Sequence, residues 1–193
     1  MTVECWIGQE FEQAHEMRAF RMVLQQLMEH FSQPGELICL LANFYCNGAD
    51  IDLAVIKERA VILIELKECD QAVSGSPNGE WRIQNGAILN QGRLNPYQQV
   101  RQYRYALMNY LSAQRSAFLP EQKARQVSFE HVAALVVFSP HLAPGSRFEI
   151  PLRDRKWFGV FGLDKLWEEI KDRRSDHIHL DQGSIRKFAA QVL

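Results

Sequence analysis

The sequence predicts an α/β fold in which a small central mixed β-sheet is flanked by helices. Short apolar runs bounded by turn residues predict strands, and they alternate along the chain with stretches of helical periodicity. The chain has 193 residues, 47% of them hydrophobic, which suffices for one domain with a sizeable core. We therefore expect a single domain over residues 1–193, with a core at about 7–171 and a C-terminal helical appendage at about 172–193.

Composition and charge exclude several classes of protein. The net charge of -1 excludes a surface that is basic throughout, but it is compatible with a local basic groove. No apolar run approaches the roughly 20 residues of a membrane span. The N-terminal segment also lacks the basic and apolar regions of a secretory signal. The four cysteines form no Cys-x-x-Cys pair, so we expect no zinc knuckle and a reducing, cytoplasmic setting.

The first half of the chain is expected to form one helix and three strands. A stretch with apolar residues at helical spacing predicts the helix over about 7–31, which Pro34-Gly35 would end. Asn47-Gly48 predicts a tight turn between two strands, and the Lys57-Glu58-Arg59 segment predicts a polar turn before the third. The apolar runs that predict the strands are 36–45, 50–56 and 61–67.

The second half begins with a glycine-rich segment and continues with helices and strands. Glycines and a proline punctuate residues 70–93, which we interpret as a long loop with a small hairpin anchored by Trp81 and Ile83. Asn95-Pro96 is a start signal for the next helix. The remaining expected elements are a helix at 97–111, strands at 131–138 and 157–161, and short helices at 163–171 and 184–192.

Charged side chains interrupt two of the apolar strands. Asp50 and Asp52 lie in the second strand, and Glu65 and Lys67 lie near the end of the third. Because these two strands pair antiparallel across a short turn, Asp52 comes opposite the far end of the third strand. Side chains alternate between faces along a strand, so Glu65 and Lys67 point the same way. We therefore expect two carboxylates and one ammonium group in a single patch at the edge of the sheet.

Such a trio suits metal-assisted hydrolysis of a phosphodiester. A buried, unpaired charge is costly, so carboxylates in such places are usually paired or bound to a metal ion. Aspartate and glutamate oxygens suit Mg²⁺ or Mn²⁺, which would activate a water molecule, and a nearby lysine could orient that water. The alternative is an ordinary strand end, in which Lys67 and Asp52 form a surface salt bridge of little energetic value.

Four longer segments carry a more specific pattern: NGADIDLAVI, VILIELKE, NGEWRI and NPYQQVRQY. Together they resemble the nuclease-related domain family, NERD, a branch of the PD-(D/E)xK nuclease superfamily. Gln99 and Tyr103 also fit the Gln-x-x-x-Tyr pattern of RecB-like nucleases. The resemblance runs from about Glu10 to about Ile170, and it departs from the superfamily pattern where Ala49-Asp50 replaces the expected Pro-Asp.

The resemblance implies a restriction-endonuclease-like core and a role for each matched residue. Asp52, Glu65 and the main-chain carbonyl of Leu66 would bind the metal ion. Lys67 would assist the attacking water, and Gln99 would support this constellation from the following helix. These are the residues that we expect to be catalytic or metal-binding.

Several further residues are candidates for a supporting role. Tyr103 would lie one helical turn beyond Gln99, although this pair could also be plain helix surface. The family usually adds an acidic residue from the first helix, for which Glu16 is favoured, Glu12 comes next and Glu10 also competes. Asp50 lies on the same face as Asp52 and is either a second ligand or a surface residue.

These roles predict a metal-dependent nuclease that hydrolyses DNA, with Mg²⁺ or Mn²⁺ as its cofactor. RNA stays open as an alternative substrate. Two other functions also stay open: a non-catalytic nucleic-acid-binding module and a regulatory protein-interaction domain. We expect no membrane partner. A homodimer would suit the cutting of two strands. Domains of this family are often joined to helicases or kinases, so a helicase or another domain in a larger protein or complex is a further expected partner. The arginines expected to contact the nucleic acid beside the site are Arg82, Arg93, Arg101 and Arg104.

Other conspicuous residues have structural interpretations. Asn95 is expected to cap its helix rather than to act in catalysis. His177 and His179 lack a supporting cluster of metal ligands, so we interpret them as surface residues. Two basic clusters are interpreted mainly as solvated surface, of which at most one need contact phosphate. They are Arg153, Arg155 and Lys156, and then Lys171, Arg173 and Arg174.

Overall fold

The computed structural model describes residues 2–31 and 35–193, and it confirms an α/β fold built on a mixed six-stranded sheet. The strands of this central sheet are β1 (Thr2–Ile7), β2 (Leu37–Cys46), β3 (Ala49–Lys57), β4 (Ala60–Glu68), β8 (Ala133–Ser139) and β10 (Phe158–Gly162). Their order across the sheet is β1-β2-β3-β4-β8-β10. The strands β2, β3 and β4 pair antiparallel, whereas β1, β8 and β10 join their neighbours in parallel.

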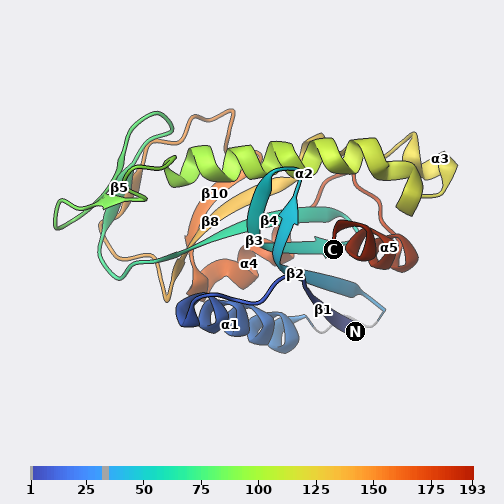
Figure 1. Ribbon diagram of the computed structural model, residues 1–193, viewed down its shortest axis with the longest axis horizontal. Helices are drawn as coiled ribbons and strands as arrows, with labels where there is room; N and C mark the ends of the chain where they lie inside the picture. Colours follow the sequence, from blue (N-terminus) through green and yellow to red (C-terminus); the bar gives the residue numbers. More distant parts are fainter. Residues whose placement is uncertain (1, 32–34) are drawn as a thin grey trace.

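Helices cover both faces of the central sheet. The long ones are α1 (Ala14–His30), α2 (Pro96–Phe118) and α5 (Gln182–Val192), and the shorter ones are α3 (Glu121–Ala124), α4 (Leu166–Asp172), η1 (Phe129–His131) and η2 (Leu163–Lys165). Figure 1 shows α1 and α2 on opposite sides of the strands, with the N-terminal ends of both helices toward the same end of the molecule. No helix in the described part of the chain combines the length and apolarity that crossing a membrane requires.

Two hydrophobic layers sandwich the sheet, and strand alternation assigns each apolar residue of β4 to one of them. Ile62 and Ile64 pack with the buried face of α1, where Leu27 is fully buried. Val61 and Leu63 pack in the other layer, with α2 and α5. Since Glu65 follows Leu63 by two positions, its side chain comes to the α2 side of the sheet.

A second, small sheet lies beside the N-terminal end of α2 (Figure 1). It contains β5 (Val73–Gly75), β6 (Trp81–Ile83), β7 (Ile88–Leu89) and β9 (Arg147–Phe148), in the order β7-β6-β5-β9. Trp81 is fully buried, donates from Nε1 to the carbonyl of Ser76 (3.1 Å) and packs on Phe148, so its predicted role as an anchor is confirmed. A Cβ at Gly75 would lie 2.5 Å from the Trp81 ring, so this close contact requires glycine.

The N-terminal segment differs from the expected continuous helix over 7–31. The chain begins with β1, and α1 starts only at Ala14. Between them, Gly8 lies so close to β2 that a Cβ there would meet the carbonyl oxygen of Asn43 at 2.9 Å. The helix ends at His30, and Pro34 of the predicted stop signal lies outside the described residues, whereas Gly35 has the left-handed φ of 87°.

The strand and turn predictions for the β2–β3–β4 meander are confirmed, except at Lys57. Asn47 and Gly48 have φ angles of 47° and 87°, as a tight hairpin turn requires. Lys57, expected in a polar turn, is the last residue of β3 and is only 5% exposed. Its Nζ donates to the carbonyls of Ile170 and Lys171, which satisfies acceptors at the C-terminal end of α4.

The C-terminal helices are more integrated than the expected appendage at 172–193. Ile185, Phe188 and Ala189 of α5 are buried in the same hydrophobic layer as α2. Phe188 meets Phe118 of α2 edge to face, with ring centroids 5.4 Å apart. The helix α2 also extends seven residues beyond its predicted end at Leu111, and its last residue, Phe118, makes this contact.

Candidate active site

The candidate site lies where β3 and β4 stop pairing. The ladder between these strands ends at the pair Leu53–Ile64. Beyond it, the N–H of Leu66 donates to Oδ2 of Asp52 (2.8 Å) instead of to a backbone carbonyl. The carboxylate of Asp52 therefore takes the place of a main-chain acceptor, and the strand edge opens at this point.

The neighbouring strand β2 is also distorted at this level. Asn43 lies opposite Asp52, but these two do not pair, although the flanking pairs Ala42–Leu53 and Phe44–Ile51 do. Asn43 has a left-handed φ of 45°, and its side-chain amide donates to the carbonyl of Glu10 at 2.7 Å. The same residue therefore combines a break in the ladder with an anchor for the segment that leads into α1.

Glu65 is the most deeply buried charged group of the site. It is 2% exposed, and its Oε1 accepts a hydrogen bond from Nζ of Lys67. Its Oε2 is buried and has no hydrogen-bond partner among the described residues. Burial raises the pKa of Glu65, and the Lys67 ammonium opposes this rise.

Asp52 and Glu65 destabilise each other's ionised form. Burial raises the pKa of Asp52 to about 8, and the nearby Glu65 charge adds to the rise. The hydrogen bond from Leu66 and the charge of Lys67 lower it again, but only in part. Two buried carboxylates with a single ammonium group leave an excess of negative charge, which a cation would neutralise.

A chain of side-chain hydrogen bonds extends from Lys67 to α2. Gln99 accepts from Lys67 through Oε1 (3.3 Å) and donates from Nε2 to the hydroxyl of Tyr103 (2.7 Å). The same Oε1 accepts from Nδ2 of Asn90 (2.7 Å), which follows β7 in the second sheet. Burial raises the pKa of Tyr103 to about 12, with smaller contributions from the charges of Glu65 and Asp52. The structure therefore brings Gln99 and Tyr103 to the site as expected, and it adds Asn90.

The sequence contained no signal for Asn90. It stands in an ordinary turn segment between β7 and α2, where asparagine is common because it tolerates a left-handed conformation. Its φ is 61°, as such a turn requires. Only the folded arrangement shows that its amide reaches Gln99.

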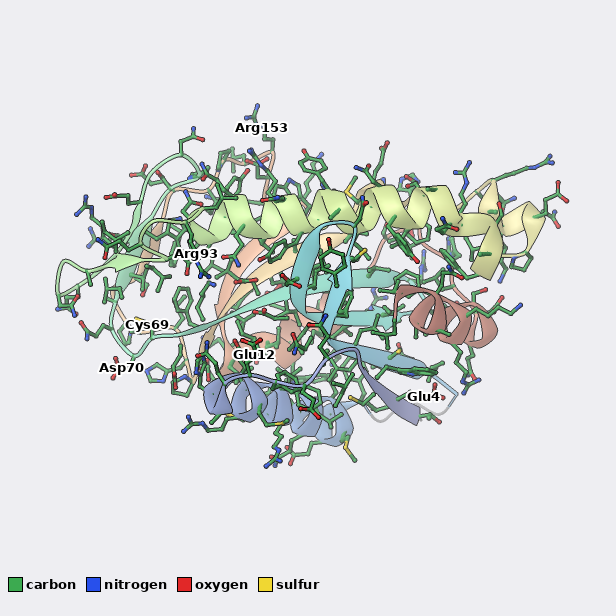
Figure 2. All side chains as sticks on the ribbon, in the orientation of Figure 1. Glu4, Glu12, Cys69, Asp70, Arg93 and Arg153 are labelled. Carbon is green, nitrogen blue, oxygen red and sulfur yellow. The ribbon has the colours of Figure 1, made fainter. Side chains whose placement is uncertain are left out.

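One groove of ≈ 700 Å³ between α1, β3, β4, the second sheet and α2 is lined by Asp52, Glu65, Lys67, Asn90, Gln99 and Tyr103. Glu16 lines it from α1, and its charge raises the pKa of both Asp52 and Glu65. Asp50 lines it as an exposed residue. Glu12 is exposed and does not line the groove; Figure 2 shows it just before α1. Glu10 is also exposed and outside it.

Of the four arginines expected to bind nucleic acid, one lines the groove and three do not. Arg93 lines the groove and lies by the N-terminal end of α2 (Figure 2). Arg82 is paired with Glu80 on the surface, and the guanidinium of Arg101 lies 5.6 Å from the centre of the Tyr97 ring, so neither lines the groove. Arg104 is buried and bonds main-chain carbonyls, so its expected position beside the site is wrong. Arg18 of α1 lines the groove without having been predicted.

The donor set fits a hard divalent cation. Among residues 2–31 and 35–193, no group of three or more histidine, cysteine, aspartate or glutamate side chains is arranged to hold a metal ion. Two carboxylates do converge, however, and Mg²⁺ is commonly held by one or two carboxylates together with water. In an extended strand the N–H and the carbonyl of one residue point to the same side, so the Leu66 carbonyl is directed toward Asp52.

Comparison with known families assigns the chain. The family model for the nuclease-related domain, NERD, matches residues 10–139. The chain belongs to this family. The match contains Asp52, Glu65, Lys67 and Gln99, begins where the resemblance was expected to begin, and ends with β8 rather than near Ile170. Neither a curated protein nor a solved structure matches this NERD protein significantly.

Membership of the NERD family makes the chain nuclease-related. The matched region contains the converging carboxylates, the lysine and the glutamine, whereas β10, α4 and α5 lie outside it. The NERD match therefore covers the groove on its β3, β4 and α2 sides, together with the α1 residues that line it.

Proposed function

We propose that this NERD protein is a metal-dependent nuclease that hydrolyses phosphodiester bonds in DNA. The observation that carries the proposal is the unpartnered, buried Oε2 of Glu65 beside the second carboxylate of Asp52. A buried acceptor without a partner costs about 1–3 kcal/mol, and more when it is charged. A bound cation would offset this cost, whereas an ordinary strand end would leave it uncompensated.

Asp52, Glu65 and the main-chain carbonyl of Leu66 would hold Mg²⁺ or Mn²⁺. When bound, such an ion lowers the pKa of a water molecule and neutralises negative charge on phosphate. The protein contributes the fixed positions of these oxygens: the Leu66 N–H holds Asp52, and Lys67 holds Glu65. Glu16 and Asp50 lie close enough to support the site electrostatically.

Lys67 would act on the reacting groups. Its side chain is 13% exposed at the groove, and its ammonium is held between Glu65 and Gln99. From there it would orient the attacking water or stabilise negative charge on the phosphate. Gln99 would keep the ammonium in place, and Tyr103 and Asn90 would fix the orientation of the Gln99 amide.

The substrate would reach the groove between α1 and the second sheet. Arg18 and Arg93 line it on these two sides and would contact the phosphate backbone. DNA is the proposed substrate, and RNA is the alternative that the same phosphate chemistry would allow.

The test is a cleavage assay with purified protein on plasmid and single-stranded DNA, in Mg²⁺, Mn²⁺ or EDTA. We expect cutting that depends on metal and that Asp52→Ala and Lys67→Ala both abolish. Asp164→Ala and Lys165→Ala remove the same charges from an exposed part of the surface and should cut normally. A parallel RNA substrate assigns the nucleic acid.

The remaining outcomes distinguish the alternatives. Cutting that persists in both site variants would come from a contaminant or another site and would refute the proposal. DNA binding without cutting would favour a non-catalytic nucleic-acid-binding module. Neither activity, with normal folding, would favour a regulatory protein-interaction domain.

A further inference from the structure

A second cavity lies at the other end of the central strands from the carboxylates. Its volume is ≈ 430 Å³, and it is lined by Ala60 at the start of β4 and Ala133 at the start of β8. Glu65 lies five positions beyond Ala60 along the extended strand, which corresponds to about 17 Å at roughly 3.3 Å per residue. The cavity is therefore distinct from the candidate active site.

The charge of this cavity is predominantly positive. Five cationic side chains line this cavity, which we call the basic groove. They are Arg104, Arg153, Lys156, Arg173 and Arg174. The two carboxylates that line it are Glu130 and Asp176, and Asp176 already pairs with Arg59. The surrounding acids therefore leave the basic groove with an excess of positive charge.

Two arginines of the basic groove, Arg104 and Arg173, are largely buried and are held by contacts within the protein. Arg104 is 7% exposed, donates from Nε to the carbonyl of Val132 (2.7 Å) and lies 4.8 Å from the centre of the Trp157 ring. Arg173 is held loosely by Glu169 at 3.6 Å. Burial lowers the pKa of both guanidinium groups. A bound anion would compensate these buried charges, and a guanidinium retains further N–H donors for it.

The rim of the basic groove is exposed and spread out. Arg153 has a side chain that is 87% exposed, and Lys156 and Arg174 are exposed as well. The imidazole rings of His131 and His177 stack at 4.0 Å along the same cavity. Cations distributed over a floor and a wide rim match a ligand with several phosphates better than a single small anion.

We propose that the basic groove binds phosphate groups of a nucleic-acid backbone, at a site separate from the candidate active site. The ligand class is a phosphate-bearing polyanion, and the contacts are charge-assisted and independent of base sequence. Free phosphate compounds share this chemistry and form the second source to be distinguished. This inference does not depend on catalysis, because it concerns other residues and requires no metal ion.

The test measures binding of a fluorescein-labelled 20-nucleotide single strand by anisotropy in EDTA, over a range of salt concentrations. The variant Lys156→Ala/Arg174→Ala should weaken binding and reduce the slope of log K against log salt by about 1.4, since each contact with a single strand contributes roughly 0.7. The control Arg115→Ala/Lys187→Ala removes the same charges from exposed positions elsewhere and should bind like the unmodified protein.

A calorimetric titration with pyrophosphate forms the second arm. Loss of pyrophosphate binding in Lys156→Ala/Arg174→Ala, with unchanged oligonucleotide binding, would refute the nucleic-acid backbone as the ligand and assign the site to a free phosphate compound. Unchanged binding of both probes would overturn the proposal. Since both arms run without metal, failure of the nuclease proposal would leave either result intact, and cleavage by the unmodified protein would not rescue a failed binding result.

Discussion

Asn90 fixes the direction in which the Gln99 amide points. Gln99 Oε1 accepts from both Lys67 and Asn90, so its Nε2 is left to face Tyr103. If the Asn90 donor were absent, the Gln99 amide could rotate and present its NH₂ group to the Lys67 ammonium. Donor would then face donor, and the ammonium would lose the support that holds it at the groove.

We therefore predict that Asn90→Gly slows metal-dependent hydrolysis by up to about 100-fold, since a displacement of about 1 Å at a catalytic group can cost that much. Glycine adopts the φ of 61° freely, so this variant removes the side chain without straining the backbone. The measurement is kcat and KM on a DNA substrate, beside the melting temperature. A reduced kcat with unchanged KM and melting temperature would support positioning, whereas unchanged kinetics would contradict it.

The residues of the candidate site were predictable to different degrees. Asp52, Glu65 and Lys67 followed from strand alternation, because charged groups inside apolar strands are conspicuous. Arg104 was misplaced, since the charge of an arginine on a helix does not reveal whether main-chain carbonyls bind it, as those of Glu130 and Val132 do here. Asn90 was missed because its role arises only when the second sheet packs against α2.

Among the elements, the second sheet supports the site through a single large anchor. Trp81 of β6 packs against Gly75 of β5 and Phe148 of β9, and it is fully buried. The helix cap reinforces the same junction: Oδ1 of Asn95 accepts from the N–H of Gln98 (2.9 Å), and its Nδ2 donates to the carbonyl of Gly79 (2.7 Å). The predicted cap is confirmed, and it also ties α2 to the second sheet.

Trp81→Ala should therefore destabilise the fold by about 3–5 kcal/mol, the usual cost of removing a buried aromatic side chain. Chemical denaturation monitored by circular dichroism measures this loss. Trp81→Phe keeps most of the volume and should retain more of the stability. A loss below ~1 kcal/mol for the alanine variant would show that the second sheet is not anchored by this residue.

The helix α5 depends on a carboxylate cap. Asp181 accepts from the N–H of Ser184 (2.8 Å) and from Nζ of Lys123 (2.6 Å), and these bonds lower its pKa to about 2. We predict that Asp181→Ala costs about 0.5–2 kcal/mol at neutral pH, whereas Asp181→Asn retains most of the cap. Because the folded-state pKa lies below the ordinary value, the carboxylate contribution is complete above pH ~4 and disappears as the pH falls toward 2.

Denaturation at several pH values checks this prediction. The difference between the unmodified protein and Asp181→Ala should shrink between pH ~4 and ~2. A difference that stays constant over this range would rule out the carboxylate as the stabilising group.

Elements with a long apolar run were predicted well, and elements defined by their tertiary partners were not. The strands β2, β3, β4 and β8 were identified because burial on both faces demands near-continuous apolar sequence. The edge strand β1 is exposed along much of its length, so no apolar run marks it. Its pairing with β2, more than 30 residues away, makes it a strand, and sequence periodicity does not register such a partner.

At the scale of the whole molecule, the net charge of -1 conceals two separated regions of opposite character. Carboxylates gather around the end of β4, where Asp50, Asp52, Glu65 and Glu68 line one groove. Cations gather at the start of the same strand, in the basic groove. An average over the sequence hides this division, because it contains no information on which charges share a surface.

The carboxylate region predicts how the whole protein responds to metal. In EDTA, Asp52→Asn should melt at a higher temperature than the unmodified protein, because the buried Asp52 carboxyl must either carry a charge beside Glu65 or, below its pKa of about 8, take up a proton on folding. Added Mg²⁺ at about 100 times its dissociation constant should stabilise the unmodified protein by ~2.7 kcal/mol, or roughly 5–11 °C. Asp52→Asn and Glu65→Gln should lose most of this rise. Equal rises in all three proteins would place the bound metal elsewhere.

The hairpin that carries both carboxylates also sets an order of assembly. The strands β3 and β4 join across the short turn at Glu58-Arg59, so their pairing closes only a small loop and can form on a timescale of about 1–10 μs. Ile62 pairs with Val55 on β3, seven positions away, and with Ala133 on β8, 71 positions away. The second pairing closes a loop about ten times longer, and this loop contains α2, which must pack on the sheet for β8 to reach β4. We therefore expect the two carboxylates to meet while water still screens them, and their repulsion to grow when α2 and β8 exclude that water. Divalent cations should therefore accelerate this late docking step and leave the formation of the hairpin unchanged.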